Sequence, residues 1–183
     1  MVYLVVMDKR SGKVVVLAHC LLNQNSVVWE LAKTGGVFKG LVDFLAEKGY
    51  GIVQLPCPET SYMGLRRFWQ SAEQYDNPGF RKHCRNLVEQ IIDYLEALRE
   101  GGIEVVALIG VRGSPSCGIF ETFSSLWRGN PLEAEGGSRI SGRGVFMRIL
   151  IDALKEKGFE LKCFDFDTSD PEGSLERIKG ELG

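Results

Sequence analysis

Three cysteines, Cys20, Cys57 and Cys117, each come within a few residues of the end of an apolar, β-branched run. Open parallel sheets bind ligands outside the carboxyl ends of their strands, so this placement gathers the three thiols at one edge. Buried thiolates repel one another unless they pair as disulfides or bind a soft metal. A zinc ion takes four ligands and a cubane cluster has four irons, so three cysteines leave one position open. The pattern therefore predicts a metal centre that performs chemistry.

Further reactive groups stand beside these cysteines. Residues 113–118 read GSPSCG, in which glycines allow close backbone approach, and Ser114 and Ser116 offer hydroxyls to sulfur or to a developing anion. Glu59 follows Cys57 by two residues and can activate water or donate a proton. Purely structural roles for these residues stay open, because Glu59 also suits the first turn of a helix and the two serines also suit a turn.

Strands and helices alternate along the chain and would position these groups. Apolar runs predict strands at residues 13–18, 51–55, 103–110 and 159–166, and helical spacing predicts helices at residues 37–48, 80–99, 145–157 and 171–182. We expect residues 2–7 to add an edge strand through a hairpin, and residues 56–79 to form a polar loop. The alternation predicts an α/β fold: a three-layer Rossmann-like domain with a mainly parallel sheet and the cysteine ligands at the carboxyl ends of its strands.

Composition narrows the class of protein. The chain has 183 residues, 44% of them apolar and 25% charged, which is typical of a single globular domain over residues 1–183. The formal net charge is −2, so the chain lacks the excess of basic residues that is typical of nucleic-acid-binding proteins. We therefore expect a small-molecule partner. No stretch is long enough to span a bilayer, so no membrane partner is expected.

The cysteine count and the N-terminal segment indicate a reducing compartment. Residues 1–7 are apolar but lack a basic leader and are followed at once by three charged residues, which does not fit a signal peptide. Five cysteines, an odd number, do not suggest a disulfide framework. We therefore expect a cytoplasmic protein with reduced thiols. Cys84 and Cys163 fall inside predicted elements and are expected to pack in the core.

Five short motifs carry a resemblance to a known family. They are HCLLN at residues 19–23, CPE at 57–59, GLR at 64–66, GSPSCG at 113–118 and GRGVF at 142–146. As an ordered set they resemble the thiouracil desulfidase (TudS) family, a group of iron–sulfur enzymes. The likeness runs from about Val14 to Leu154.

The resemblance implies a [4Fe-4S] cluster held by Cys20, Cys57 and Cys117, whose fourth iron takes the sulfur of a thiocarbonyl substrate. The implied reaction is a non-redox hydrolysis in which the open iron acts as a Lewis acid and transiently holds the sulfide product. The family's catalytic carboxylate and serine map onto Glu59 and Ser114.

Three further residues are assigned to substrate: Ser116, Asn23 and Arg66. Arg66 and its neighbour Arg67 are either solvated surface charge or cations that favour an anionic cluster, and Arg66 is the one assigned. The chain departs from the family at residues 24–30, where it reads QNSVVWE in place of an Arg-Tyr-Asp-Gly stretch. We therefore expect a related desulfidase that acts on a thiolated small molecule such as a thiouracil, with the identity of the preferred compound left open, and a homo-oligomer stays open.

Two other functions compete with desulfidation. A non-catalytic iron–sulfur or sulfur-carrier protein would deliver sulfide to a partner without turnover of its own. A metal-free thiol enzyme would use Cys117 as nucleophile and His19 as base, but it leaves two cysteines unexplained. The run SGRG at residues 141–144 fits an N-cap with close helix packing better than an anion cradle.

Overall fold

The computed structural model describes residues 8–125 and 136–183. Its main sheet contains β1 (Lys13–Leu17), β2 (Gly51–Gln54), β3 (Glu104–Val111) and β6 (Lys162–Phe166). The strands lie in the order β2-β1-β3-β6 and every neighbouring pair is parallel. The predicted edge strand at residues 2–7 lies outside the described residues.

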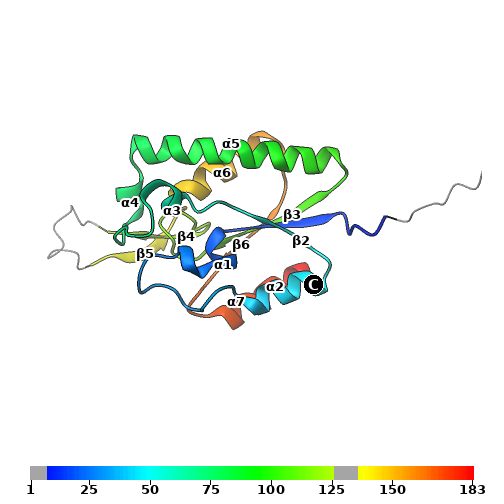
Figure 1. Ribbon diagram of the computed structural model, residues 1–183, viewed down its shortest axis with the longest axis horizontal. Helices are drawn as coiled ribbons and strands as arrows, with labels where there is room; N and C mark the ends of the chain where they lie inside the picture. The colour runs from blue at the N-terminus through cyan, green and yellow to red at the C-terminus, as the bar shows by residue number, and fades with distance from the viewer. Residues whose placement is uncertain (1–7, 126–135) are drawn as a thin grey trace, which may run out of the picture.

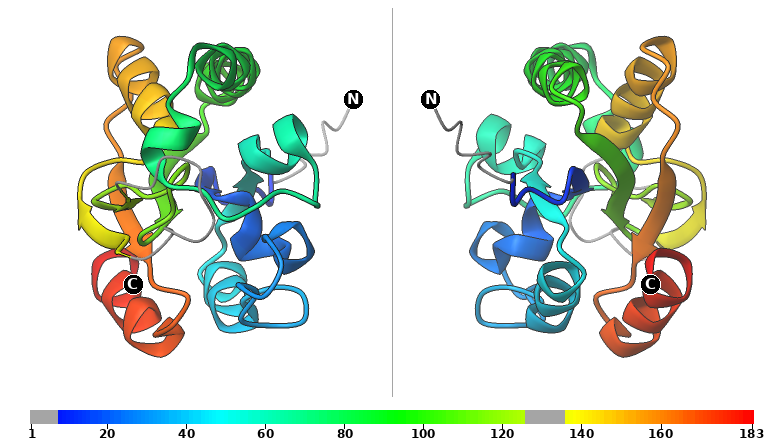
Figure 2. Two further views of the ribbon diagram at one scale, coloured as in Figure 1. Left: turned by 90° about the vertical axis from the view of Figure 1, so that its left-hand side faces the viewer. Right: turned by 90° about the vertical axis from the view of Figure 1, so that its right-hand side faces the viewer.

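Helices cover both faces of this sheet. The helices α5 (Pro78–Glu100) and α6 (Val145–Glu156) pack together on one face, and α2 (Lys39–Glu47) and α7 (Pro171–Leu182) on the other (Figures 1 and 2). The three-layer α/β fold with a parallel sheet is therefore confirmed, and the predicted strands and helices are found within a few residues of their expected bounds.

The core lies around the two central strands. Val16 in β1 and Leu108 in β3 are fully buried, because each strand has a neighbour on both sides and helices on both faces. Such strands read as continuous apolar runs, which is why the sequence identified them. The helix α5 begins where the Asn77 side chain accepts the Phe80 N–H, with Pro78 in the first turn.

Several short elements at the carboxyl edge of the sheet differ from the prediction (Figure 1). The loop predicted for residues 56–79 was wrong in part, because α3 (Pro58–Met63) and α4 (Ala72–Tyr75) form there. Four other elements were not predicted: α1 (His19–Leu22), a 3-10 helix at Gln24–Ser26, and the antiparallel pair β4 (Glu121–Ser124) and β5 (Ser138–Ser141). Within residues 8–125 and 136–183, no helix combines the length and apolar character needed to cross a membrane.

The β4–β5 pair is anchored to the end of the sheet by charged groups. Arg112, just after β3, forms an ion pair with Glu121, and Asp167, just after β6, pairs with Arg139 on β5. One carboxylate, that of Asp165, accepts the backbone N–H groups of residues 119–121. These contacts fix the course of the chain between β3 and β4, where Cys117 lies.

Candidate functional site

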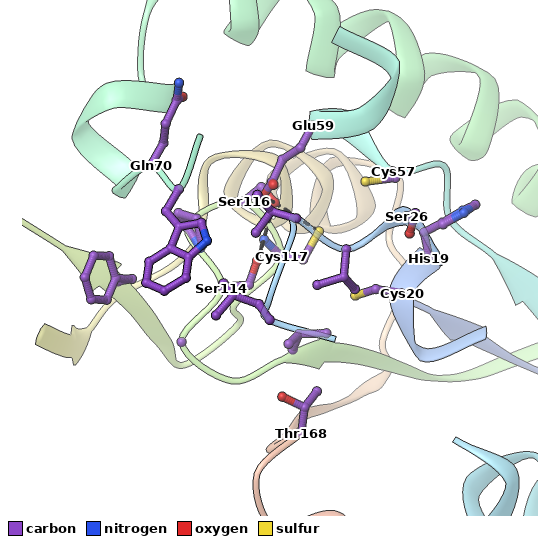
Figure 3. A pocket seen from close by; sticks show the side chains of 18 of the residues that line it. His19, Cys20, Ser26, Cys57, Glu59, Gln70, Ser114, Ser116, Cys117 and Thr168 are labelled. Atoms are coloured by element: carbon purple, nitrogen blue, oxygen red, sulfur yellow. Dashed lines mark hydrogen bonds between the residues drawn. The ribbon is translucent and has the colours of Figure 1, made fainter. Parts of the chain in front are cut away.

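The strand order brings Cys20, Cys57 and Cys117 to one edge of the sheet. The residues follow β1, β2 and β3, which are neighbours in the sheet: Cys20 lies in α1, Cys57 caps α3, and Cys117 lies in the loop after β3. All three side chains line one cavity of about 410 Å³, and Figure 3 shows them beside Glu59, Ser114 and Ser116. The predicted convergence of the three thiols is found in the structure.

Local hydrogen bonds orient two of the sulfur-bearing residues. The Cys57 sulfur accepts the Thr60 N–H at 3.4 Å, so the thiol caps a helix that Pro58 begins. The Cys117 N–H donates to Ser114 Oγ at 3.0 Å, which closes a tight turn around the third thiol. Both cysteines are thus placed by backbone contacts that do not depend on a bound metal.

The N-terminus of α6 packs against the Cys117 loop and holds it through backbone hydrogen bonds. The first N–H groups of this helix lack partners within the helix, and those of Phe146 and Met147 donate to the Ser116 carbonyl. The Gly144 N–H donates to the Gly118 carbonyl. A Cβ atom on Gly144 would lie 2.4 Å from the Ser116 carbonyl carbon, so only glycine allows this approach. The close packing expected at residues 141–144 is therefore found against the Cys117 loop, but the N-cap of α6 is Gly144 and makes no side-chain capping bond.

Burial and mutual repulsion disfavour thiolates at this site in the absence of a cation. Burial, followed by the charges of Cys57 and Glu59, raises the pKa of the Cys20 thiol to about 12. Burial, followed by Cys20 and Cys57, raises the pKa of Cys117 well above its ordinary value. Metal ligation requires the deprotonated thiol, and a bound cation supplies the compensating charge. The donor set therefore fits a soft metal group.

The arrangement of the three cysteines does not suit a single metal ion. Among the described residues, no group of three or more His, Cys, Asp or Glu side chains is arranged to hold a single metal ion. In an iron–sulfur cluster each thiolate binds its own iron atom, so ligation of a cluster does not require the sulfurs to share one ion.

Glu59 lies at the centre of a buried polar network. Its Oε1 accepts the Ser116 hydroxyl at 2.6 Å and its Oε2 accepts the Arg67 Nε–H at 3.0 Å. Ser116 Oγ also lies 3.4 Å from the Cys117 sulfur, but its single hydrogen is engaged by the much closer carboxylate. Burial, followed by the charge of Glu59, raises the pKa of the neighbouring Tyr75 far above its ordinary value.

The structure separates the residues assigned to substrate. Ser114 and Ser116 line the cavity, whereas Asn23 and Arg66 do not. The Asn23 oxygen caps the 3-10 helix through the Asn25 N–H, and its amide nitrogen lies 3.4 Å from His19 Nε2. Arg66 is exposed. The geometry thus gives Asn23 and Arg66 no contact with the cavity, and the assignment of these two residues is not retained.

Arg67 occupies the place expected of Arg66. Its side chain is 2% exposed, and it lines the cavity as the ion-pair partner of Glu59. The sequence alone does not separate two adjacent arginines in a loop, because no periodicity indicates which of them points inward. The following aromatic pair, Phe68 and Trp69, was also missed; two large apolar residues inside a polar stretch were the available signal.

His19 lines the cavity but is held by two other groups. Its Nδ1 lies 3.1 Å from the Leu55 carbonyl, a contact that requires a hydrogen on Nδ1. Its Nε2 then faces the Asn23 amide as an acceptor. Within the described part of the chain, no hydrogen bond joins His19 to Cys117. This geometry does not favour the metal-free thiol enzyme, which needs His19 as the base for Cys117.

Aromatic and cationic side chains both line the cavity. Phe68 is 78% exposed and Trp69 55% exposed, yet both line the cavity. The Trp69 indole N–H donates to the Trp29 carbonyl, which joins two loops at the rim. Lys33 and Arg139 also line the cavity, and Arg139 is paired with Asp167.

Comparisons with known proteins bear on this site. Residues 12–137, which include the three cysteines, match the family described as "Putative 2-thiouracil desulfurase". The chain is 39% identical over 112 residues to "Uncharacterized protein MJ0003" of Methanocaldococcus jannaschii, covering 61% of this chain and 71% of that protein. A solved structure described as "[4Fe-4S]-dependent thiouracil desulfidase TudS" matches with a TM-score of 0.47 and 16% identity, over 92% of this chain and 99% of the other.

Proposed function

This chain belongs to the family described as 2-thiouracil desulfurases, and we propose that it removes sulfur hydrolytically from a thiolated small molecule. The single observation that carries the proposal is the convergence of Cys20, Cys57, Cys117 and Glu59 on one cavity. Three soft ligands and one carboxylate are the groups that desulfidation needs: a thiophilic metal for the sulfur and an acid/base for water.

The proposed cofactor is a [4Fe-4S] cluster on Cys20, Cys57 and Cys117. Three ligands for four irons leave one iron free, and the bound cluster would supply a Lewis acid for the sulfur of the substrate. The residues fit this group in two respects. The three thiols line one cavity, with Cys117 buried and Cys20 and Cys57 half-buried, and the raised pKa values of Cys20 and Cys117 indicate that these two thiols ionise only when a cation compensates.

Two side chains of the protein, Glu59 and Ser114, would supply the proton transfer and the hydrogen bonding that the reaction needs. Glu59 is placed to take a proton from water that attacks the carbon bearing sulfur, since its carboxylate lies beside the cysteine loop. Ser114 Oγ accepts the Cys117 N–H and lies 3.4 Å from Ser116 Oγ, whose own hydrogen is taken by Glu59, so the Ser114 hydrogen is available to Ser116 or to the substrate. Water adds its oxygen to that carbon, sulfur leaves as sulfide, and no electrons are gained or lost.

The substrate is proposed to be a small thiolated ring such as a thiopyrimidine. Phe68 and Trp69 present aromatic faces at the mouth of a cavity of about 410 Å³, where a flat ring can stack. The difference from the family sequence at residues 24–30 bears on substrate preference, because four residues of this stretch line the same cavity: Gln24, Ser26, Val27 and Val28. The preferred ring is therefore expected to differ from that of desulfidases with the Arg-Tyr-Asp-Gly stretch.

Metal analysis tests the cofactor. In protein prepared without oxygen we expect about four irons and four acid-labile sulfides per chain. Cys20→Ala, Cys57→Ala and Cys117→Ala should each lose them, whereas Cys84→Ala, at a buried cysteine outside the cavity, should not. Wild-type protein without iron after anaerobic reconstitution would refute the cluster.

Sulfide release tests the reaction. Loaded protein should release sulfide from a panel of thiolated pyrimidines and yield the oxygen-containing product, and Glu59→Ala should stop release while iron content persists. Binding of sulfide by loaded protein without turnover of any substrate would instead support the sulfur-carrier alternative.

A further inference from the structure

Arg67 is an unusually buried cation for a residue in a loop. It lies between α3 and α4, directly after exposed Arg66, yet its side chain is 2% exposed. A buried charge is costly unless hydrogen bonds and an opposite charge compensate it. Its environment must therefore hold the guanidinium in a defined position.

Most of the partners of Arg67 are neutral and fixed. Nη1 donates to Thr60 Oγ1 and to the Gly64 carbonyl, both at 3.1 Å, and Nη2 donates to the Ser26 carbonyl at 3.0 Å. These three bonds set the plane and direction of the guanidinium without any help from Glu59. The fourth bond, from Nε to Glu59 Oε2 at 3.0 Å, is then made by a donor that is already oriented.

The carboxylate of Glu59 is held from both sides as a result. Oε2 meets the guanidinium, and Oε1 meets the hydroxyl of Ser116, the residue before Cys117. A carboxylate fixed at both oxygens has little rotational freedom, and such alignment of a catalytic group matters mainly in the transition state.

We propose that Arg67 is a positioning residue that fixes the Glu59 carboxylate beside the Cys117 loop. This inference rests on the proposed function, in which Glu59 handles the proton of the attacking water. Arg67 does not itself touch the substrate in this account. It acts through Glu59, so its loss lowers kcat and leaves KM and cluster content largely unchanged.

The test compares Arg67→Met with the matched control Arg66→Met. The control removes the neighbouring arginine, which is exposed and does not line the cavity, and it leaves the Glu59 ion pair in place. In loaded protein we expect kcat of Arg67→Met to fall about 100-fold with KM within about threefold. Arg66→Met should keep kcat within about twofold of wild type.

A crystal structure of each loaded variant supplies a readout independent of activity. In Arg67→Met the Glu59 carboxylate should leave Ser116 or adopt several conformers, while in Arg66→Met it should stay in place. If Arg67→Met does not fold, Arg67→Lys replaces it, because the ammonium keeps the charge but cannot reproduce the fork of bonds.

Two outcomes overturn the inference: an unmoved Glu59 in the Arg67 variant, or an equal loss of kcat in Arg66→Met, which would show that the loss of a positive charge near the cavity, and not the position of Glu59, lowers kcat. Failure of the proposed function looks different. Loaded wild-type protein would then release no sulfide from any substrate, and the position of Glu59 in the two variant structures would still decide the role of Arg67.

Discussion

Gly144→Ala tests whether α6 holds the Cys117 loop in place. The backbone of Gly144 has φ −61 and ψ 153, which any residue adopts, so alanine adds no backbone strain. Its Cβ would meet the carbonyl carbon of Ser116 at 2.4 Å and the nitrogen of Cys117 at 2.8 Å. Ordinary contact begins at 3.4 Å, so the helix and the loop must separate by about 1 Å.

The cost of this separation follows from two effects. Overpacking of this size costs about 1–3 kcal/mol, and stretching the bonds from Phe146 and Met147 to the Ser116 carbonyl adds roughly 1 kcal/mol. The free energy of unfolding should therefore fall by about 3 kcal/mol, which lowers Tm by roughly 6–12 °C for a chain of this size. Because the loop carries Cys117, iron content should fall as well.

Urea unfolding and iron analysis of Gly144→Ala and Gly180→Ala provide the measurement. Gly180 is an exposed residue in α7 with no atom within 4 Å of the added Cβ, so alanine there should be neutral or stabilising by up to about 1 kcal/mol. Wild-type stability and iron content in Gly144→Ala would refute the account of the loop.

Two further predictions concern stability. Leu108→Ala, at a fully buried position in β3, should lower the free energy of unfolding by about 3 kcal/mol. Tyr94→Ala, at a side chain that is 55% exposed, should change it by less than about 1 kcal/mol. Urea unfolding measures both changes. For Asp167, burial acts to raise the pKa, but the Ser169 N–H and Arg139 outweigh it and lower the pKa below 3.8. A carboxyl whose folded pKa is depressed stabilises the fold above the unfolded pKa, so the advantage of wild type over Asp167→Asn should be present at pH 6 and shrink as the pH falls through 3.8. An advantage that persists unchanged at pH 3 in urea unfolding would contradict this assignment.

The regular elements could be predicted because their patterns are long. The strands β1 and β3 are buried on both faces and therefore form continuous apolar runs, and α5 repeats its apolar residues over 23 residues. The position of the three cysteines followed from those strands and from the rule that ligands gather at their carboxyl ends.

The short elements around the site gave no comparable signal. Helices of four residues such as α1 and α4 have too few positions to show a period, and they form because tertiary contacts hold them. The same reason explains the side-chain errors. Whether Arg66 or Arg67 points inward depends on the path of a loop that is fixed by the Ser26 and Gly64 carbonyls, which no local pattern reveals.

The separation of the three cysteines along the chain has a consequence for the order of assembly. In motifs such as Cys-X-X-Cys, neighbouring thiols can capture iron before a chain has folded. Here the thiols come from three separate strand-to-loop junctions, and in an unfolded chain their meeting would require two long loops to close at once. The β2-β1-β3 arrangement must therefore form first, so a cluster would have to be delivered to an already folded acceptor through the mouth of its cavity. Folding of the chain and loading of the proposed cluster would accordingly be separate events, and protein produced without iron should be folded.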